Sequence, residues 1–490
     1  MQLNSDDHFL VLDLKKRFHI AVSFVLLCST GLLAQSAPVS PDHPWHTSTE
    51  ISVEADARNI PDLRFTIDSA KRYSLPELID LAEAHNPATR VSWERALAQA
   101  ANLGVVRSEL YPTLVAAALS QTGRAEVDFG NRFDGQTIQE FQIALDLNYT
   151  VFDFGARSGR INAAKAHVLA ANFAFNDTHR KVIYQVQQAY YRLLSSMGQE
   201  DAARASLANA QTVQQAAEQR LANGLATLPD VLESRSATAQ AEYDLQSILG
   251  TEEIARGDLG TAIGASATAV IQVQPLDQVP TPESIGDTVD QAINRALGQR
   301  PDLMQQVAGI RSANARVKEE RAAYYPSLSL GVSPAEQSLY GFQSPYPWAH
   351  TTQLGGGISF GLQWSIFDGG ARKSRLAAAR AEVHAAEAQA NVKRNQIADE
   401  VWTAYSNLNT AFRQRQAAVA LLESASQSYS AALQSYNYGV RNLLDVTAAQ
   451  RTLAQARSAD ISARTQVLAS FADLAFRTGD SIRANWRPGP

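Results

Sequence analysis

Side chains that could carry out catalysis or bind a metal occur in this chain, but they are scattered. Nine histidines are spread along 490 residues, and the closest pair, His43 and His46, lies in a proline-containing segment that offers no groups to orient metal ligands. Cys28 is the only cysteine, and the sequence contains no Gly-x-Ser-x-Gly elbow, phosphate loop or paired zinc motif. We therefore expect no enzyme, no cofactor and no metal site.

Two acidic residues follow glycine-containing turns at matching places in the chain. Gly224 precedes Asp230, and Gly439 precedes Asp445, 215 residues later. Each glycine would supply a turn conformation that a side chain opposes. The carboxylates could cap the helices that follow or could lie at the gate of a conduit, and the two roles are compatible.

This match belongs to a duplication of almost the whole chain. Residues 87–114 and 301–328 carry the same frame at an offset of 214, and only one residue of net shift accumulates before the glycine turns. A period of this length indicates a duplicated half-molecule and not a solenoid. We predict a first structural repeat over 73–265, a linker over 266–282 and a second repeat over 283–480.

The N-terminal region reads differently. A basic cluster, an apolar run and small residues predict a signal peptide over residues 1–36. Residues 37–72 are polar and contain several prolines, so we expect a mobile tail there and a second tail over 481–490. A lipid anchor on Cys28 is the alternative, although the bulky Leu27 precedes it.

Each repeat contains a segment in which apolar and polar residues alternate strictly. Such alternation over 139–152 and 358–366 predicts strands with one apolar and one polar face. Residues 113–121 and 327–333 are the expected partner strands, which gives four strands per chain. The apolar face of the first strand would carry Phe141, Ile143, Leu145, Leu147, Tyr149 and Val151.

Long proline-free segments rich in good helix formers follow the strands. They predict helices over 154–221 and 369–436, each about 100 Å long, with Asp153 and Asp368 placed to cap them. Shorter helices over 87–110 and 229–263 would together match the length of a long one. A coiled-coil stripe is expected in each long helix, formed by Val182, Val186, Tyr190 and Leu193 and by Ile397, Val401, Tyr405 and Leu408.

Four half-apolar strands cannot close on themselves in lipid, because their edge N–H and C=O groups would lack partners. Several chains must therefore pool their strands, and three chains giving twelve strands is the preferred number, with two or four left open. Residues 122–138 and 334–354 would be outer loops. The Phe141 and Ile358 faces would contact lipid, and the faces that carry Asp146, Asn148 and Gln363 would line water.

The charge and hydropathy patterns exclude some functions and structures. The net charge is −6 and 19% of residues are charged, so there is no basic surface that predicts nucleic-acid binding. Apart from the signal peptide, no apolar stretch approaches the roughly 20 residues of a transmembrane helix. The sequence therefore predicts entry into a membrane through strands.

Three frames over residues 73–480 resemble those of the TolC family of outer-membrane efflux channels. They are Tyr-Pro-Ser/Thr-Leu, Phe-Asp-x-Gly-x-Arg and Tyr-x-x-Gly-x-x-x-x-x-Asp-Val. The resemblance implies an α+β membrane protein, namely a homotrimer whose twelve-stranded β-barrel lies in outer-membrane lipid and continues as an α-helical barrel across the periplasm. Its partners would be a periplasmic adaptor, or membrane fusion protein, and an inner-membrane transporter of a tripartite efflux or type I secretion system.

The resemblance also implies roles for the residues at the far ends of the helices. Tyr436 would bond Asp230, Arg441 would bond the facing tip, and Asp445 would form an acidic constriction; these links would close a periplasmic gate. The competing hypothesis is a coiled-coil stalk or adhesin anchored in the outer membrane. The duplicated strands and the return of each long helix favour the channel.

Overall fold

The computed structural model describes residues 42, 50–61, 65–128, 130, 133–282, 284, 286–343 and 346–480. The predicted signal peptide, Cys28 and the C-terminal tail over 481–490 lie outside these residues. The chain divides into two units, Met1–Leu63 and Arg64–Pro490. The first contains helix α2 (Glu50–Arg58), which has no buried residues, and the second contains all the elements described below.

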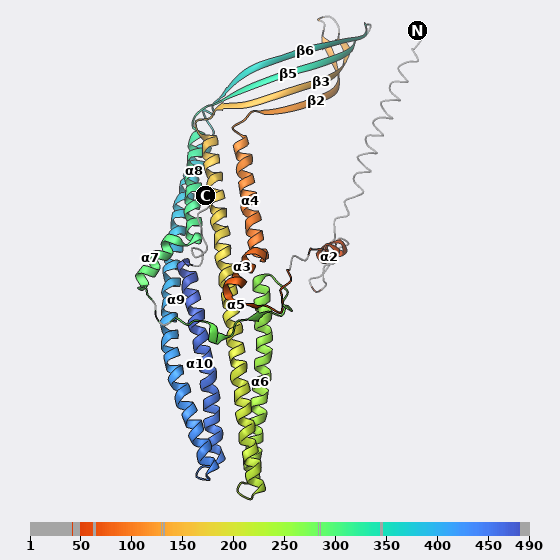
Figure 1. Ribbon diagram of the computed structural model, residues 1–490. Coiled ribbons are helices and arrows are strands. Elements are labelled where there is room, and N and C mark those ends of the chain that lie inside the picture. The colour runs from red at the N-terminus through yellow and green to blue at the C-terminus, as the bar shows by residue number, and fades with distance from the viewer. Residues whose placement is uncertain are drawn as a thin grey trace. The chain divides into compact units, whose positions relative to one another are not determined.

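Helical hairpins dominate the second unit. Figure 1 shows α5 and α6 side by side as one hairpin and α9 and α10 as another, with both turns at the end opposite the sheet. The long helices begin and end within two residues of the predicted positions. The helices are α3 (Leu75–His85), α4 (Pro87–Ser108), α5 (Ala156–Ala222), α6 (Leu228–Ile263), η2 (Leu276–Gln278), α7 (Val289–Gln299), α8 (Pro301–Ala322), α9 (Ala371–Asn437) and α10 (Leu443–Thr478).

Helix starts follow local capping chemistry. Asp153 accepts hydrogen bonds from the backbone N of Gly155 (3.2 Å) and of Arg157 (2.8 Å), and Asp368 does the same for Gly370 (3.1 Å) and Arg372 (2.9 Å). Both aspartates therefore satisfy first-turn N–H groups, as predicted. The residue directly before each helix is a glycine with positive φ, which turns the chain sharply from strand to helix.

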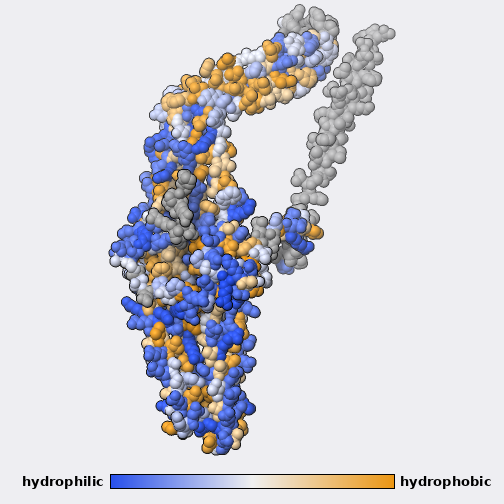
Figure 2. Space-filling model, viewed as in Figure 1, coloured by the Kyte–Doolittle hydropathy of each residue, from blue (hydrophilic) through white to orange (hydrophobic). Residues whose placement is uncertain are grey.

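Four antiparallel strands form one sheet in the order β2-β3-β5-β6. They are β2 (Thr113–Asp128), β3 (Phe133–Phe152), β5 (Ser327–Gln343) and β6 (Tyr346–Gln363). The register pairs Leu147 with Leu114 on one side and with Val332 on the other, and directly paired residues share a face. The apolar side chains thus continue from strand to strand, and Figure 2 shows them gathered on the part of the sheet nearer the helices.

The strands are longer than predicted. The expected outer loops over 122–138 and 334–354 were wrong, because β2 and β3 remain paired out to Asp128 and Phe133, and β5 and β6 out to Gln343 and Tyr346. At its other end, β6 stops at Gln363, short of the predicted 366. Strand pairing continues beyond the apolar band, where apolar and polar residues no longer alternate strictly and the pattern no longer marks a strand.

Segments predicted as tail and linker also pack onto the helices. Strand β1 (Arg72–Tyr73) pairs in parallel with β4 (Gln272–Val273). Phe65 and Ile67, within the predicted mobile tail, and Ile271, within the linker, join an apolar core against α5. That part of the tail is therefore packed, because its apolar residues cover the end of α6.

The predicted coiled-coil stripes form the cores of the hairpins. Val182, Val186, Tyr190 and Leu193 are buried in one cluster, and Ile397, Val401 and Leu408 are buried in another, with Tyr405 partly buried beside it. Within the described part of the chain, none of the helices combines the length and apolar content needed to cross a bilayer.

Candidate gate at the helical tips

The two hairpins end in turns, residues 223–227 and 438–442, which we call the tips. Gly224 (φ 72°) and Gly439 (φ 76°) adopt the left-handed conformation predicted for them. Each donates its backbone N–H, at 2.9 Å, to the carbonyl three residues earlier. The two tips are thus the same chain reversal built twice.

The two tip aspartates lie in the first turns of α6 and α10, but neither is the capping residue itself. Thr227 precedes α6, and the carboxylate of Asp230 accepts hydrogen bonds from its backbone N (2.9 Å) and hydroxyl (2.7 Å). Asn442 caps α10 by accepting from the backbone N of Asp445 (3.0 Å). Asp230 thus takes part in capping α6 through a capping box with Thr227, whereas at α10 the capping side chain is that of Asn442 and not of Asp445; both first-turn carboxylates also favour the helix dipole.

The Asp230 hydrogen bonds favour its ionised form. The backbone N–H of Thr227 and then its hydroxyl lower the pKa of Asp230, because both donate to the carboxylate. Asp445 and Arg441 are exposed in the single chain. Both are therefore positioned where another copy could meet them.

Tyr436 does not make the expected bond to Asp230. Its side chain is 4% exposed, and its hydroxyl has no hydrogen-bond partner among the described residues. Burial raises the pKa of Tyr436. The link drawn from the family resemblance is therefore absent among the described contacts of one chain, in which the Asp230 carboxylate bonds Thr227 instead.

Arg220, in the last turn of α5, is the tip residue that the sequence did not single out. Its Nη1 donates to the carbonyl of Tyr436 (2.9 Å) and to that of Asn437 (3.3 Å), and its guanidinium lies 4.7 Å from the centre of the Tyr436 ring. The corresponding position in the second repeat is Ser435. The duplication therefore gave no signal for it.

An apolar core joins the two hairpins just behind the tips. Tyr436 belongs to it, and so do residues from all four helices. The buried members include Val213 and Ala217 of α5, Val231 of α6, Tyr429 and Ala432 of α9, and Leu443 and Val446 of α10. In this structure the two hairpins are therefore packed against each other at their tips.

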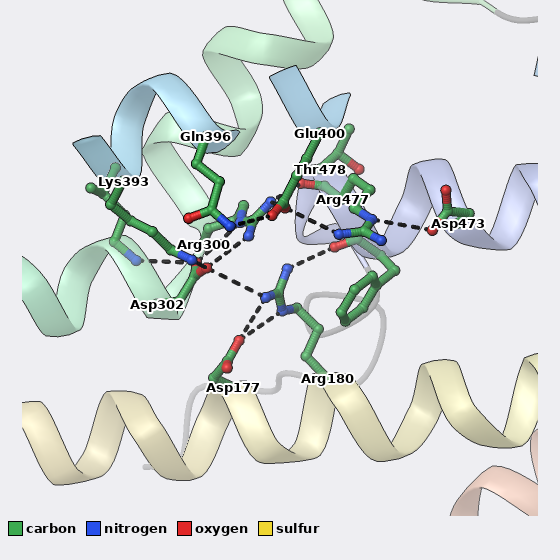
Figure 3. Close-up of polar contacts among 12 residues, drawn as sticks. Asp177, Arg180, Arg300, Asp302, Lys393, Gln396, Glu400, Asp473, Arg477 and Thr478 are labelled. Atoms are coloured by element: carbon green, nitrogen blue, oxygen red, sulfur yellow. Dashed lines mark hydrogen bonds and ion pairs between the residues drawn. The ribbon is translucent and has the colours of Figure 1, made fainter. Parts of the chain in front are cut away.

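The other end of α10 is held by a buried group of charges, the ionic cluster, drawn in Figure 3. Its members come from α5, from the start of α8, from α9 and from α10; they are Asp177, Arg180, Arg300, Asp302, Lys393, Glu400, Asp473 and Arg477. Arg180 and Arg300 are 1% and 2% exposed. Buried charges of this kind persist only when they are paired and hydrogen-bonded.

Arg300 is the centre of the ionic cluster. Its guanidinium donates to both oxygens of Asp302 (3.0 and 2.7 Å) and to Glu400 (2.6 Å), while Arg180 donates to the carbonyl of Phe476 (2.8 Å) at the end of α10. Burial alone would raise the pKa of Asp302 and of Glu400, but the hydrogen bonds from Arg300 lower both overall.

At the matching position of the first repeat, an uncharged side chain bonds the carbonyl at the end of the neighbouring helix. Asn86 occupies the position of Arg300, and its Nδ2 donates to the carbonyl of Ala262 (2.8 Å), just as Arg300 Nη1 reaches the carbonyl of Arg477 (3.3 Å). Ala88 stands where Asp302 stands in the second repeat. The ionic cluster joins α5 of the first repeat to the start of α8 in the second, and the matching place at the start of α4 has no counterpart of Arg300 or Asp302.

Helices about 100 Å long that follow the strands of a sheet with one apolar face are the architecture of an outer-membrane channel subunit. The family model described as "Outer membrane efflux protein" matches residues 78–265 and 292–480. The chain belongs to this family. It is an outer-membrane efflux channel protein with a periplasmic helical part, not an enzyme, and the channels of its family work in tripartite efflux and type I secretion systems.

Curated and solved proteins agree with this assignment. The chain is 28% identical to protein CyaE of Bordetella pertussis over 404 residues, covering 81% of this chain and 83% of that one. It is 26% identical to outer membrane protein OprJ of Pseudomonas aeruginosa, covering 87% and 86%. A crystal structure of a membrane protein from Pseudomonas aeruginosa shares the fold with a TM-score of 0.73 at 24% identity, covering 91% of this chain and all of that one.

Proposed function

We propose that three copies of this chain form a twelve-stranded barrel that continues as a helical barrel, and that this duct carries substrates outward from an inner-membrane transporter. The observation that supports it best is the sheet order β2-β3-β5-β6, which leaves β2 and β6 as edges. Unpaired edges of 16 and 18 residues cannot lie in lipid. Pairing β2 of one copy with β6 of the next closes the ring.

Aromatic contacts mark both ends of the proposed lipid band. Phe141 contacts Tyr340 (ring centroids 6.0 Å apart) near one end, and Phe152 contacts Phe154 (4.6 Å) at the other. The eleven residue-to-residue steps from Phe141 to Phe152 span roughly 37 Å of strand, or about 26 Å of depth at a 45° tilt. That depth fits the apolar band of about 25 Å that outer-membrane barrels present.

The tips form the gate in this proposal. Three copies of the exposed Asp445 would surround the axis as an acidic ring that favours cations, and Arg441 would bond the tip of a neighbouring copy. Asp230 and Tyr436 would support these tips from behind, with Gly224 and Gly439 fixing the turns. A periplasmic adaptor and the transporter would open the ring when they dock, and the transporter would select the substrate.

Planar-bilayer conductance of the purified protein tests this proposal. Replacing both Asp445 and Arg441 by alanine should raise the conductance several-fold. The variant loses the constriction formed by the Asp445 side chains and the bond from Arg441 to the tip of the neighbouring copy. The matched control replaces Asp258 and Arg192, an exposed pair at 2.7 Å far from the tips, and should change nothing. A raised current in both variants, or in neither, would contradict a gate at the tips.

The mass of the detergent-extracted particle tests assembly separately. Three copies per particle are expected, and a particle of one copy would exclude the shared barrel. A trimer that never conducts, even as the double variant, would instead support the stalk or adhesin.

A further inference from the structure

Among the hydrogen bonds described, Arg220 of α5 bonds the carbonyls at the end of α9. Helix α9 ends at Asn437, so the last carbonyls of the helix have lost their intrahelical partners. The Arg220 guanidinium bonds the carbonyls of Tyr436 and Asn437 and places a positive charge at the negative end of the helix dipole. The contact thus caps one hairpin with a side chain of the other.

The same guanidinium lies over the Tyr436 ring, where a cation is attracted by the aromatic face. The ring is held in turn by the apolar core behind the tips. Arg220 therefore fixes the position of the α9 tip relative to α5 by charge, hydrogen bonds and packing together.

Two polar atoms at this contact are buried without a hydrogen-bond partner among the described residues, namely Arg220 Nε and the Tyr436 hydroxyl. Unpartnered buried polar atoms destabilise the arrangement that buries them. Separation of the hairpins would let both atoms bond water. Burial of these two atoms therefore lowers the free energy needed to separate the hairpins, as expected of a latch, that is, a contact that must open.

We propose that Arg220 is a positioning residue of the gate, which holds the α9–α10 hairpin against α5 in the closed channel. The inference rests on the proposed function, because it assumes that the tips open. It differs from the link implied by the resemblance, in which the Tyr436 hydroxyl would bond Asp230. The two arrangements predict opposite results for the loss of that hydroxyl.

Conductance of the reconstituted full-length protein distinguishes them. Arg220→Ala should raise the open probability about tenfold, the factor for loss of one charge-assisted hydrogen bond. Tyr436→Phe should leave conductance at or below the parent level, since the hydroxyl has no partner to lose and its removal relieves the cost of burying it in the closed contact. Arg220→Lys should give an intermediate value, because lysine keeps the charge but not the planar, multiply donating group; it also serves if the alanine variant folds poorly.

Arg235→Ala is the matched control. Arg235 bonds Glu218 at 2.9 Å within the first hairpin and is mostly exposed, so its loss should leave conductance unchanged. Helical circular dichroism and particle mass should match the parent for every variant. A structural cap alone would lower stability without opening the channel, and that result would overturn the latch.

The remaining outcomes separate the latch from the gate. If the Asp445/Arg441 double variant conducts more while Arg220→Ala does not, the latch is wrong and the gate stands. If Tyr436→Phe opens the channel as much as Arg220→Ala, the hydroxyl link is right and the latch is wrong. If no tip variant conducts more, both the gate and the latch fall.

Discussion

Replacing Arg300 by asparagine and Asp302 by alanine would give the second repeat the residues that the first repeat carries at positions 86 and 88. Either single change leaves a buried charge with fewer partners, which typically costs about 3–5 kcal/mol. The double change removes both charges, and Glu400 keeps its contact with Arg477 at 3.2 Å. We expect the double variant to lose about 2–3 kcal/mol less than the sum of the singles.

Unfolding rates in guanidinium, followed by helical circular dichroism of the detergent-solubilised protein, measure these differences. A loss of 1.4 kcal/mol corresponds to a tenfold rate change if it falls on the unfolding step. The exposed pair Arg192 and Asp258 supplies the control, with an expected effect below about 1 kcal/mol. Effects that add within about 0.5 kcal/mol would refute the claim that the two charges depend on each other.

Two further predictions follow from the same helices. The pKa values of Asp302 and Glu400 are lowered in the folded protein, so the stability that their charges contribute is complete above the ordinary carboxyl range near pH 4. This stability is lost as pH falls through the lowered pKa values. Unfolding rates should therefore rise only below about pH 4, and they should rise less steeply in the Arg300→Asn/Asp302→Ala variant. A Cβ on Gly159 would lie 2.8 Å from a backbone nitrogen of α8, so Gly159→Ala should destabilise the protein by about 1–3 kcal/mol in the guanidinium assay. Gly104→Ala, with nothing within 4 Å, should stabilise α4 by up to about 1 kcal/mol, and equal effects of the two substitutions would contradict the packing argument.

Where the sequence predicted the fold well, a single physical signal decided the outcome. The helices α5 and α9 were placed within two residues, because a long proline-free segment of good helix formers has few alternatives. The strands were placed correctly only inside the apolar band. Beyond Gln121, β2 carries mostly polar or small residues and one apolar residue, Val127, so the continued pairing to Asp128 left no alternation to detect.

The site was harder to predict because its important contacts break the duplication. Gly224 and Gly439 were found since both repeats need the same turn. Arg220 corresponds to Ser435 in the second repeat, and Arg300 corresponds to Asn86 in the first. A comparison of the two repeats therefore shows each as an ordinary sequence difference. Contacts between hairpins also join residues more than 200 positions apart, and no local pattern records such a pair.

Because these contacts differ between the repeats, the second hairpin is held firmly at the ionic cluster and more weakly at its tip. About 34 residues of α10, or roughly 50 Å, separate the tip from Arg477 in the ionic cluster. A tilt of roughly 10° about the cluster would move the tip by about 9 Å, close to the spacing of packed helices. Several ion pairs hold the cluster, whereas the charged contacts described between the hairpins near the tips are those of Arg220 and one largely exposed ion pair, Arg451 with Glu233 at 3.3 Å, and two polar atoms of the Arg220 contact have no hydrogen-bond partner among the described residues. If the tips form the proposed gate, force applied by a docking partner should therefore separate them before it disturbs the cluster, and the long helix would convert a small rotation into opening of the channel.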